Sequence, residues 1–354
     1  MSHSQTFTGY VGTYTKGSSE GVYTFTLDVA AKKLKDVRPV ANIDNPTYVN
    51  ISKNNQYLYA VVKEGDQGGV AAYTIDSHSG DLTFINKQLL EGASPCYVSI
   101  NQGNDMVLTA NYHKGTVESY AASSENGAVE PASSIVEHTG KGPNKERQEK
   151  PHVHYADFTP DEKYAVVVDL GTDQIVTYTV DTDGKLTEAS RFSTAPGAGP
   201  RHLTFHPNGK YAYVMTELSS EVLVLSYNDQ DGSFTQLQAI STIPADFKEN
   251  NQGSAIHLSK DGRFVYAGNR GHDTIAVFQV HEDSGQLTFV EWTSTEGNWP
   301  RDFVLDPTEQ FVIASNQETG NLVLFERSSE TGKLTLLDSS VDVPYAVCVK
   351  FLNQ

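Results

Sequence analysis

The chain has 354 residues, of which 38% are hydrophobic, and its formal net charge at pH 7 is −18. Nucleic-acid binding depends on Lys and Arg against phosphate, so this acidic balance argues against a nucleic-acid partner. No apolar run reaches the length needed to span a bilayer, so we expect no membrane partner. The N-terminal segment lacks the charged and apolar regions of a signal peptide, and Cys96 and Cys348 are expected to be free thiols in the cytoplasm.

One strand pattern, rich in β-branched, apolar and aromatic residues, recurs seven times. Its copies begin at Gly21, Gly69, Gly115, Gln174, Glu221, Thr274 and Asn321. Another short apolar strand, the first strand of each unit, ends just before a turn. Its last residues are Ile51, Ile100, Phe158, Phe205, Leu258, Leu305 and Val349. Turns of the Gly-x-Leu-Thr kind, such as GKLT and GQLT, precede a further strand. A period of roughly 40–50 residues with four strands per unit is typical of the blades of a β-propeller.

The unit between Ile100 and Phe158 contains extra residues. They fall at Glu137 to His152, a polar segment with Gly, Pro and several basic residues. One interpretation is a solvated insertion, and the other is a basic flap beside a ligand. The sequence leaves both open.

The two ends of the chain predict how the fold closes. The last unit contains only one strand, PYAVCVKF from Pro344, and the N-terminal region supplies the three strands that this unit lacks. A blade built from both termini ties a ring shut and leaves no long sheet edge exposed. We therefore predict an all-β fold, a seven-bladed β-propeller formed as a single domain over residues 1–354.

Repeat positions predict which side chains meet at one mouth of the central channel. The first strand of a blade lines the channel, so its start lies at the same face as the end of the antiparallel second strand. The expected first-strand starts are Thr47, Cys96, His154, Arg201, Ser254, Arg301 and Tyr345. The expected second-strand ends are Lys63, Tyr112, Leu170, Glu217, Arg270 and Gln317. Channel mouths are where propellers bind small ligands.

Several of these residues also admit structural roles. Arg201 and Glu217 lie across one hairpin and could form a purely structural ion pair. His152 and His154 lie on one strand face, but no further ligands of standard spacing accompany them, so we expect no metal site. The pair Asn316–Gln317 could hold neighbouring blades together.

The same segments resemble the seven-bladed 6-phosphogluconolactonase family, which also includes fungal carboxymuconate cyclases. The resemblance covers essentially the whole chain, and its most specific segments are GPRHL followed by TEL, and NRGHDTI. It implies a cytoplasmic lactonase of the oxidative pentose phosphate pathway that needs no cofactor. The family's functional residues correspond to His154 (or His152), Arg201, Glu217 and Arg270.

These residues suit the hydrolysis of 6-phospho-D-glucono-1,5-lactone to 6-phosphogluconate without a metal. We expect His154 or Glu217 to act as general base, Arg201 to stabilise the oxyanion, and Arg270 with Arg301 to hold the phosphate. Further substrate contacts are expected from His152, Asn111, Asn316 and Gln317. No G-x-S-x-G nucleophile elbow is present, so attack by water is preferred to a covalent intermediate.

Two other functions remain open at this point. One is a different lactone reaction, such as muconate-type cyclisation or hydrolysis of an unphosphorylated sugar lactone, because an arginine can also hold a carboxylate. The other is a non-catalytic propeller that binds proteins through its rim. The oligomeric state does not follow from the sequence.

Overall fold

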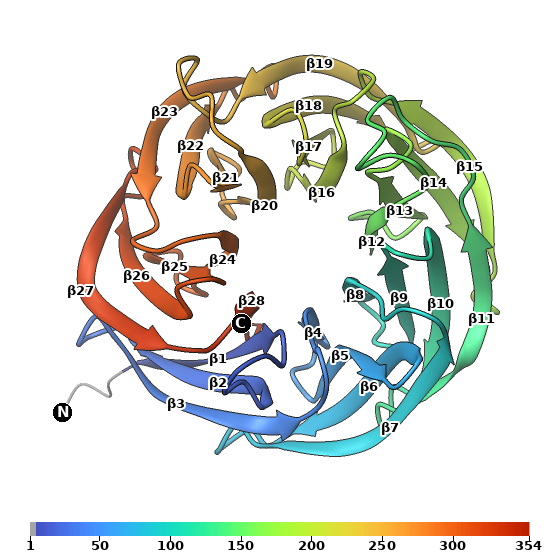
Figure 1. Cartoon of the computed structure of the whole chain (residues 1–354), viewed down its shortest axis with the longest axis horizontal. Helices are drawn as coiled ribbons and strands as arrows, with labels where there is room; N and C mark the ends of the chain where they lie inside the picture. Colours follow the sequence, from blue (N-terminus) through green and yellow to red (C-terminus); the bar gives the residue numbers. More distant parts are fainter. Residues whose placement is uncertain (1–4, 354) are drawn as a thin grey trace.

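The computed structural model describes residues 5–353, and within them the chain forms twenty-eight strands and no helix. The strands make seven four-stranded sheets that stand around a central channel like the blades of a propeller (Figure 1). The predicted all-β, seven-bladed fold is confirmed. No helix among the described residues is long and apolar enough to cross a membrane.

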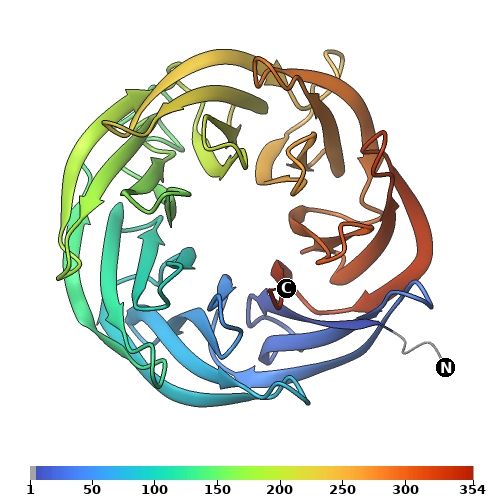
Figure 2. The same cartoon turned by 180° about the vertical axis from the view of Figure 1, so that it is seen from behind.

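Each blade contributes one strand to each of four concentric positions (Figures 1 and 2). The innermost strands are β4 (Val49–Ile51), β8 (Tyr97–Ile100), β12 (Val153–Phe158), β16 (Pro200–Phe205), β20 (Gln252–Leu258), β24 (Pro300–Leu305) and β28 (Ala346–Phe351). The second strands are β5 (Tyr57–Glu64), β9 (Met106–Asn111), β13 (Tyr164–Asp169), β17 (Tyr211–Thr216), β21 (Phe264–Arg270), β25 (Phe311–Asn316) and β1 (Thr6–Thr13).

The two outer positions complete each sheet. The third strands are β6 (Gln67–Ile75), β10 (Thr116–Ala122), β14 (Gln174–Val180), β18 (Glu221–Asn228), β22 (Thr274–Val280), β26 (Asn321–Arg327) and β2 (Gly21–Asp28). The outermost strands are β7 (Leu82–Glu91), β11 (Val129–Glu137), β15 (Leu186–Ser193), β19 (Ser233–Ser241), β23 (Leu287–Ser294), β27 (Leu334–Asp342) and β3 (Lys33–Asn42).

The ring is closed by a blade made from both ends of the chain. Its strand order is β28-β1-β2-β3, with Val11 of β1 opposite Val349 of β28. This arrangement confirms the closure that the incomplete last repeat predicted. It also pairs the inner edge of the N-terminal strands, so that no blade is left with three strands.

Burial falls from the middle of each blade to its rim. Strands β13 and β25 are buried along their whole length, because both faces of these strands contact the adjacent blades. After a buried first residue, strands β11 and β15 contain only exposed and half-buried residues, which alternate toward the end of each strand. This explains why the middle strands are almost continuously apolar, whereas the outermost strands are polar at alternate positions.

A hydroxyl group of one blade binds a turn glycine of the next blade at six of the seven junctions. The donor–acceptor pairs are Tyr10–Gly80, Tyr59–Gly127, Ser119–Gly184, Thr177–Gly232, Tyr213–Gly285 and Tyr266–Gly332, and in each the glycine carbonyl accepts. All six glycines have φ between 69° and 81°, a left-handed conformation that favours glycine. Four of these six glycines, at positions 80, 184, 285 and 332, begin the Gly-x-Leu-Thr turns of the sequence, so those turns also contact the adjacent blade.

Substitution of Tyr213 by Phe should lower the free energy of unfolding by about 1–3 kcal/mol, because the buried carbonyl of Gly285 loses its partner. Urea unfolding of the wild type and Tyr213→Phe measures this difference. Tyr211→Phe is the matched control, since its hydroxyl donates to the carbonyl of Asp283 at the exposed rim. An equal loss in both variants would contradict a special role for the buried contact.

Candidate active site

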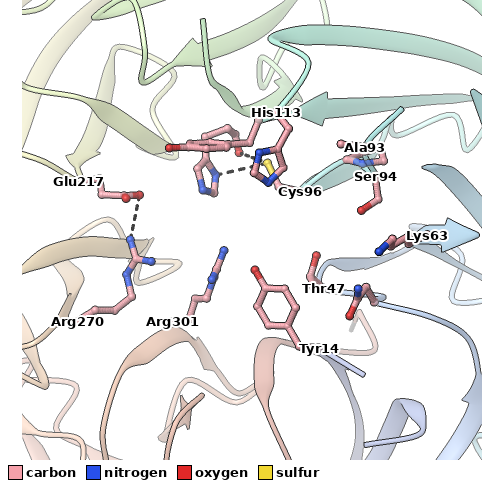
Figure 3. A pocket seen from close by; sticks show the side chains of 14 residues that line it. Tyr14, Thr47, Lys63, Ala93, Ser94, Cys96, His113, Glu217, Arg270 and Arg301 are labelled. Atoms are coloured by element: carbon pink, nitrogen blue, oxygen red, sulfur yellow. Dashed lines mark hydrogen bonds and ion pairs between the residues drawn. The ribbon is translucent and has the colours of Figure 1, made fainter. Parts of the chain in front are cut away.

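A cavity of about 420 Å³ lies at the channel mouth where first-strand starts and second-strand ends meet (Figure 3). Expected first-strand positions on its wall are Thr47, Cys96, His154 and Arg301, and expected second-strand positions are Lys63, Tyr112, Glu217 and Arg270. The other wall residues are Tyr14, Asn45, Ala93, Ser94, Pro95 and His113. The repeat positions thus located a real cavity, although they missed its loop residues.

Three first-strand residues of the site lie at irregularities in strand pairing. The register of β12 with β13 shifts around His154, that of β16 with β17 around Arg201, and that of β24 with β25 around Arg301. A bulge turns the extra residue away from the regular alternation of the strand. Equivalent bulges in three blades therefore aim one imidazole and two guanidinium groups at the channel.

Glu217 lies among three arginines. Its Oε2 is 2.9 Å from Nη2 of Arg270 and 3.2 Å from Nε of Arg201, and its Oε1 contacts Nη2 of Arg147. Burial of Glu217 would by itself raise the pKa of its carboxyl group, but the surrounding charges, led by Arg270 and Arg201, hold that pKa well below its usual range. Glu217 is therefore ionised and a weak base at neutral pH.

Arg201 is almost fully buried, at 2% exposure. Its Nε and Nη1 form no hydrogen bond within the described chain, because the approach of Nε to Glu217 has the distance of an ion pair but not the angle of a hydrogen bond. Arg201 lines a small cavity of about 10 Å³ that shares Thr47, Cys96, His154 and Arg301 with the larger one. Arg201 thus faces this small adjoining cavity and is not part of the wall of the main cavity.

The imidazole of His154 is neutral at pH 7, unlike the charged side chains near it. It is 5% exposed, and burial together with the positive charge of Arg201 lowers the pKa of its imidazole well below the ordinary value. Its Nδ1 lies 3.8 Å from Sγ of Cys96, and its ring meets those of Tyr112 and His202 edge-on. A neutral imidazole at the cavity wall can accept a proton from a bound water.

Arg270 and Arg301 differ in how many donors they have free. Arg270 donates to the backbone carbonyls of Gln252 and Gly253 and also contacts Glu217. Arg301 donates to Oε1 of Gln317, at 3.2 Å, and lies over the ring of Tyr14. Arg301 forms no ion pair with any described residue, and its Nε has no partner. Of the two, Arg301 has more capacity left for an anionic ligand.

The structure does not bring four of the expected substrate contacts to the cavity wall. Asn111 and Asn316 donate to the carbonyls of Ala93 and Thr295, and Asn269 makes the equivalent bond to Thr242 in another blade. This recurring bond holds a neighbouring loop, so it has a structural role. Direct contact of Asn111 and Asn316 with substrate stays an untested prediction.

Gln317 and His152 also have partners inside the protein. The Nε2 of Gln317 donates to Glu318, and its Oε1 accepts from Arg301, so Gln317 orients that guanidinium. His152 stacks on Tyr112, whose carbonyl lies 2.8 Å from Nδ1, and its Nε2 is 3.0 Å from Glu149. Both residues can act on a ligand through a neighbour; their direct contact with one is untested.

The insertion between β11 and β12 packs onto the site. Gln148 is completely buried and donates to Leu170 and Asp173, which fixes the loop to the adjacent blade. The next residue back, Arg147, contacts Glu217 and donates to the hydroxyl of Tyr112. The segment is therefore a basic flap beside the cavity. Its signal in the sequence was a basic loop in the one over-long repeat.

Among residues 5–353, no group of three His, Cys, Asp or Glu side chains is arranged to hold a metal ion. The thiol of Cys96 lies at the cavity wall, but burial raises its pKa to about 12. A thiol with this pKa remains protonated at neutral pH and is a poor nucleophile.

Comparison with known proteins gives consistent matches over the whole length. Residues 8–351 match the family model "Lactonase, 7-bladed beta-propeller". The chain is 61% identical over 348 residues to 6-phosphogluconolactonase of Bacillus subtilis, covering 98% of this chain and 99% of the relative. It also superposes on a crystal structure of a protein from Lactobacillus plantarum, with a TM-score of 0.94, 44% identity and coverage of 99% and 100%.

A further solved structure bears on substrate choice. The periplasmic gluconolactonase of Pseudomonas aeruginosa superposes with a TM-score of 0.92 and 32% identity, covering 98% of this chain and 99% of that one. The fold is thus shared with proteins named for phosphorylated and for unphosphorylated sugar lactones.

The free energy of unfolding should fall as the pH drops below about 6.5, the ordinary pKa of histidine in an unfolded chain. Burial lowers the pKa of His154 and His202 in the folded protein, so the unfolded state binds more protons in this range. Each should contribute a slope of about 1.4 kcal/mol per pH unit.

Urea unfolding between pH 7.5 and 5.5 measures this slope. His202→Phe should reduce it, because the ring of residue 202 packs among tyrosine rings and Phe removes the proton site. His78→Gln, at an exposed position, serves as control. A flat profile above pH 5.5 would show that the buried histidines take up protons in the folded state.

Proposed function

We propose that this chain, which belongs to the lactonase family of seven-bladed β-propellers, hydrolyses 6-phospho-D-glucono-1,5-lactone to 6-phosphogluconate. The family match together with 61% identity to a relative named 6-phosphogluconolactonase makes the protein a lactone hydrolase; the phosphorylated substrate, the mechanism and the pathway are our proposal. The observation that carries it is the cavity wall, which combines a neutral imidazole with cations that have donors free. The B. subtilis relative is named for the same reaction.

The reaction begins with attack of water on the lactone carbonyl. His154 takes a proton from the water as its oxygen bonds to C1, and a tetrahedral oxyanion forms. Collapse of that intermediate breaks the bond between C1 and the ring oxygen. The proton on His154 then passes to the departing oxygen, which leaves a hydroxyl group on C5 and a carboxyl group on C1. Water is thus added across the bond between C1 and the ring oxygen, and no covalent enzyme intermediate forms.

His154 is favoured over Glu217 as the general base. The imidazole of His154 is neutral and forms no ion pair with a described residue, whereas both carboxylate oxygens of Glu217 already contact guanidinium groups. Its three arginine contacts give it another role, which is to hold their guanidinium groups in place. Arg270 lines the main cavity and can stabilise the oxyanion, an effect typically worth ~3–4 kcal/mol for one donor. Arg201 lines only the small adjoining cavity, so its expected contact with the oxyanion stays a prediction.

The phosphate needs a cation that is not already neutralised. Arg301 has no carboxylate partner among the described residues, and a guanidinium can bind phosphate through two parallel hydrogen bonds. Arg270 was also expected to anchor phosphate, but its contacts with Glu217 and two carbonyls support a place at the carbonyl end instead. We therefore assign the phosphate to Arg301.

These steps use side chains alone, so we expect no metal requirement. We also propose that the reaction serves the oxidative pentose phosphate pathway in the cytoplasm. The second candidate is hydrolysis of an unphosphorylated sugar lactone, which the likeness to the P. aeruginosa gluconolactonase supports. The ratio of rates on the two lactones separates these candidates.

The purified, EDTA-treated protein should hydrolyse 6-phosphogluconolactone well above the spontaneous rate. His154→Ala should lower kcat by ~10²–10⁴-fold, the usual worth of a general base. Stopped-flow measurement of proton release, corrected for ring opening in buffer, gives both rates.

Two variants sharpen this assignment. Glu217→Gln should lower kcat through misplaced arginines but keep the pH profile of the wild type, whereas His154→Ala should lose the limb that reports the base. His78→Gln is the control for loss of an exposed imidazole. A wild-type rate equal to buffer would refute the substrate, and full turnover in both active-site variants would refute the residue roles.

A further inference from the structure

Lys63 is a cationic wall residue that the mechanism above does not use. It lies at the end of β5 and lines the same cavity as His154 and Arg301. Figure 3 shows it across the cavity from Glu217 and Arg270, on the same side of the view as Thr47 and Ser94. This part of the wall comes from blades that do not contribute to the arginine cluster.

The polar side-chain groups of Lys63, Thr47 and Ser94, on this side of the cavity, have no hydrogen-bond or ion-pair partner among the described residues. The ammonium group of Lys63 forms no ion pair or hydrogen bond with a described residue, and the adjacent Glu64 is paired with Lys87. The hydroxyl groups of Ser94 and Thr47 likewise form no hydrogen bond in residues 5–353, although Thr47 is only 9% exposed. One cation and two hydroxyl groups with free donors form a set that suits phosphate oxygens.

On the opposite side of the cavity, the charged side chains are already paired with one another. There the carboxylate of Glu217 already engages three guanidinium groups. A dianion would compete with Glu217 on that side, whereas no carboxylate lines this cavity on the Lys63 side; the acidic residues near Lys63 (Asp44, Glu64, Asp66 and Glu91) line adjoining hollows. Electrostatics therefore favours the Lys63 side for the more highly charged end of a substrate.

The carbonyl and the phosphate of the substrate are separated along the molecule, as the two sides of the cavity are separated across the channel mouth. In a 1,5-lactone the carbonyl carbon C1 and the carbon C5 that bears the phosphorylated arm flank the ring oxygen, so several bonds separate carbonyl from phosphorus. When the carbonyl lies beside His154 and Arg270, the phosphate must extend away from them. Figure 3 shows Arg301 and Tyr14 between Arg270 and Lys63, so the direction past Arg301 leads toward Lys63.

We propose that Lys63, with the hydroxyl groups of Thr47 and Ser94, binds the substrate phosphate on the side away from Arg301 and sets the preference for a phosphorylated lactone. The proposal rests on the proposed function and adds a specificity-determining residue to it. It makes Lys63 a binding group that acts on KM more than on kcat.

The test compares 6-phosphogluconolactone with glucono-1,5-lactone as substrates of the full-length protein. Lys63→Met should lower the ratio of kcat/KM for the phosphorylated to the unphosphorylated lactone by about 10- to 100-fold, the effect of losing a charge-assisted hydrogen bond. Lys63→Arg should restore most of that ratio. Lys53→Met, which removes the same charge from the other channel mouth, should leave it unchanged.

Product binding gives a second readout that does not need turnover. Calorimetry should show weaker binding of 6-phosphogluconate to Lys63→Met, with gluconate affected much less. Wild-type turnover of 6-phosphogluconolactone with the ratio and product affinity unchanged in Lys63→Met would overturn the role of Lys63 alone. A wild type that hydrolyses only the unphosphorylated lactone would instead overturn the proposed function. Equal losses on both lactones would show that Lys63 acts on the reacting end.

Discussion

The burial of both faces of the middle strands is the constraint on which the whole structure depends. Strands such as β13 and β25 are apolar on both sides, so a single four-stranded sheet would leave one face in water. Stacking seven sheets in a ring removes that surface, and pairing β28 with β1 removes the last open edge. The ring in turn brings seven first strands to one axis, and that convergence creates the site.

The charge distribution at the channel mouth is the opposite of that of the whole molecule. A protein with a net charge of −18 gathers Arg147, Arg201 and Arg270 around one carboxylate, Glu217. A buried carboxylate is stable in this setting only because each oxygen contacts a cation. Glu217 thus contacts all three arginines, whereas the neutral imidazole of His154 forms no ion pair with a described residue.

The cavity consequently has two unlike ends. One end has fixed, internally paired charges beside His154, which suits a reaction in which negative charge develops only in the transition state. The other end has free donors, which suits a group that is charged before and after the reaction. Under the proposed function, this separation would hold a phosphorylated lactone in a single orientation.

The sequence by itself determined the number of blades and their closure, because strand period, turn chemistry and repeat spacing are local properties. Of the thirteen positions that it placed at the channel mouth, eight lie on the cavity wall. It could not determine which of two adjacent strand-end residues faces the cavity. Asn111 and Asn316 lie one position from wall-facing or wall-supporting residues, and alternation turns their side chains to loop carbonyls. Only the tertiary structure decided that bulges aim His154, Arg201 and Arg301 inward and that Arg147 reaches Glu217 from an insertion. Bulges and loop packing depend on contacts between blades, which no local pattern encodes.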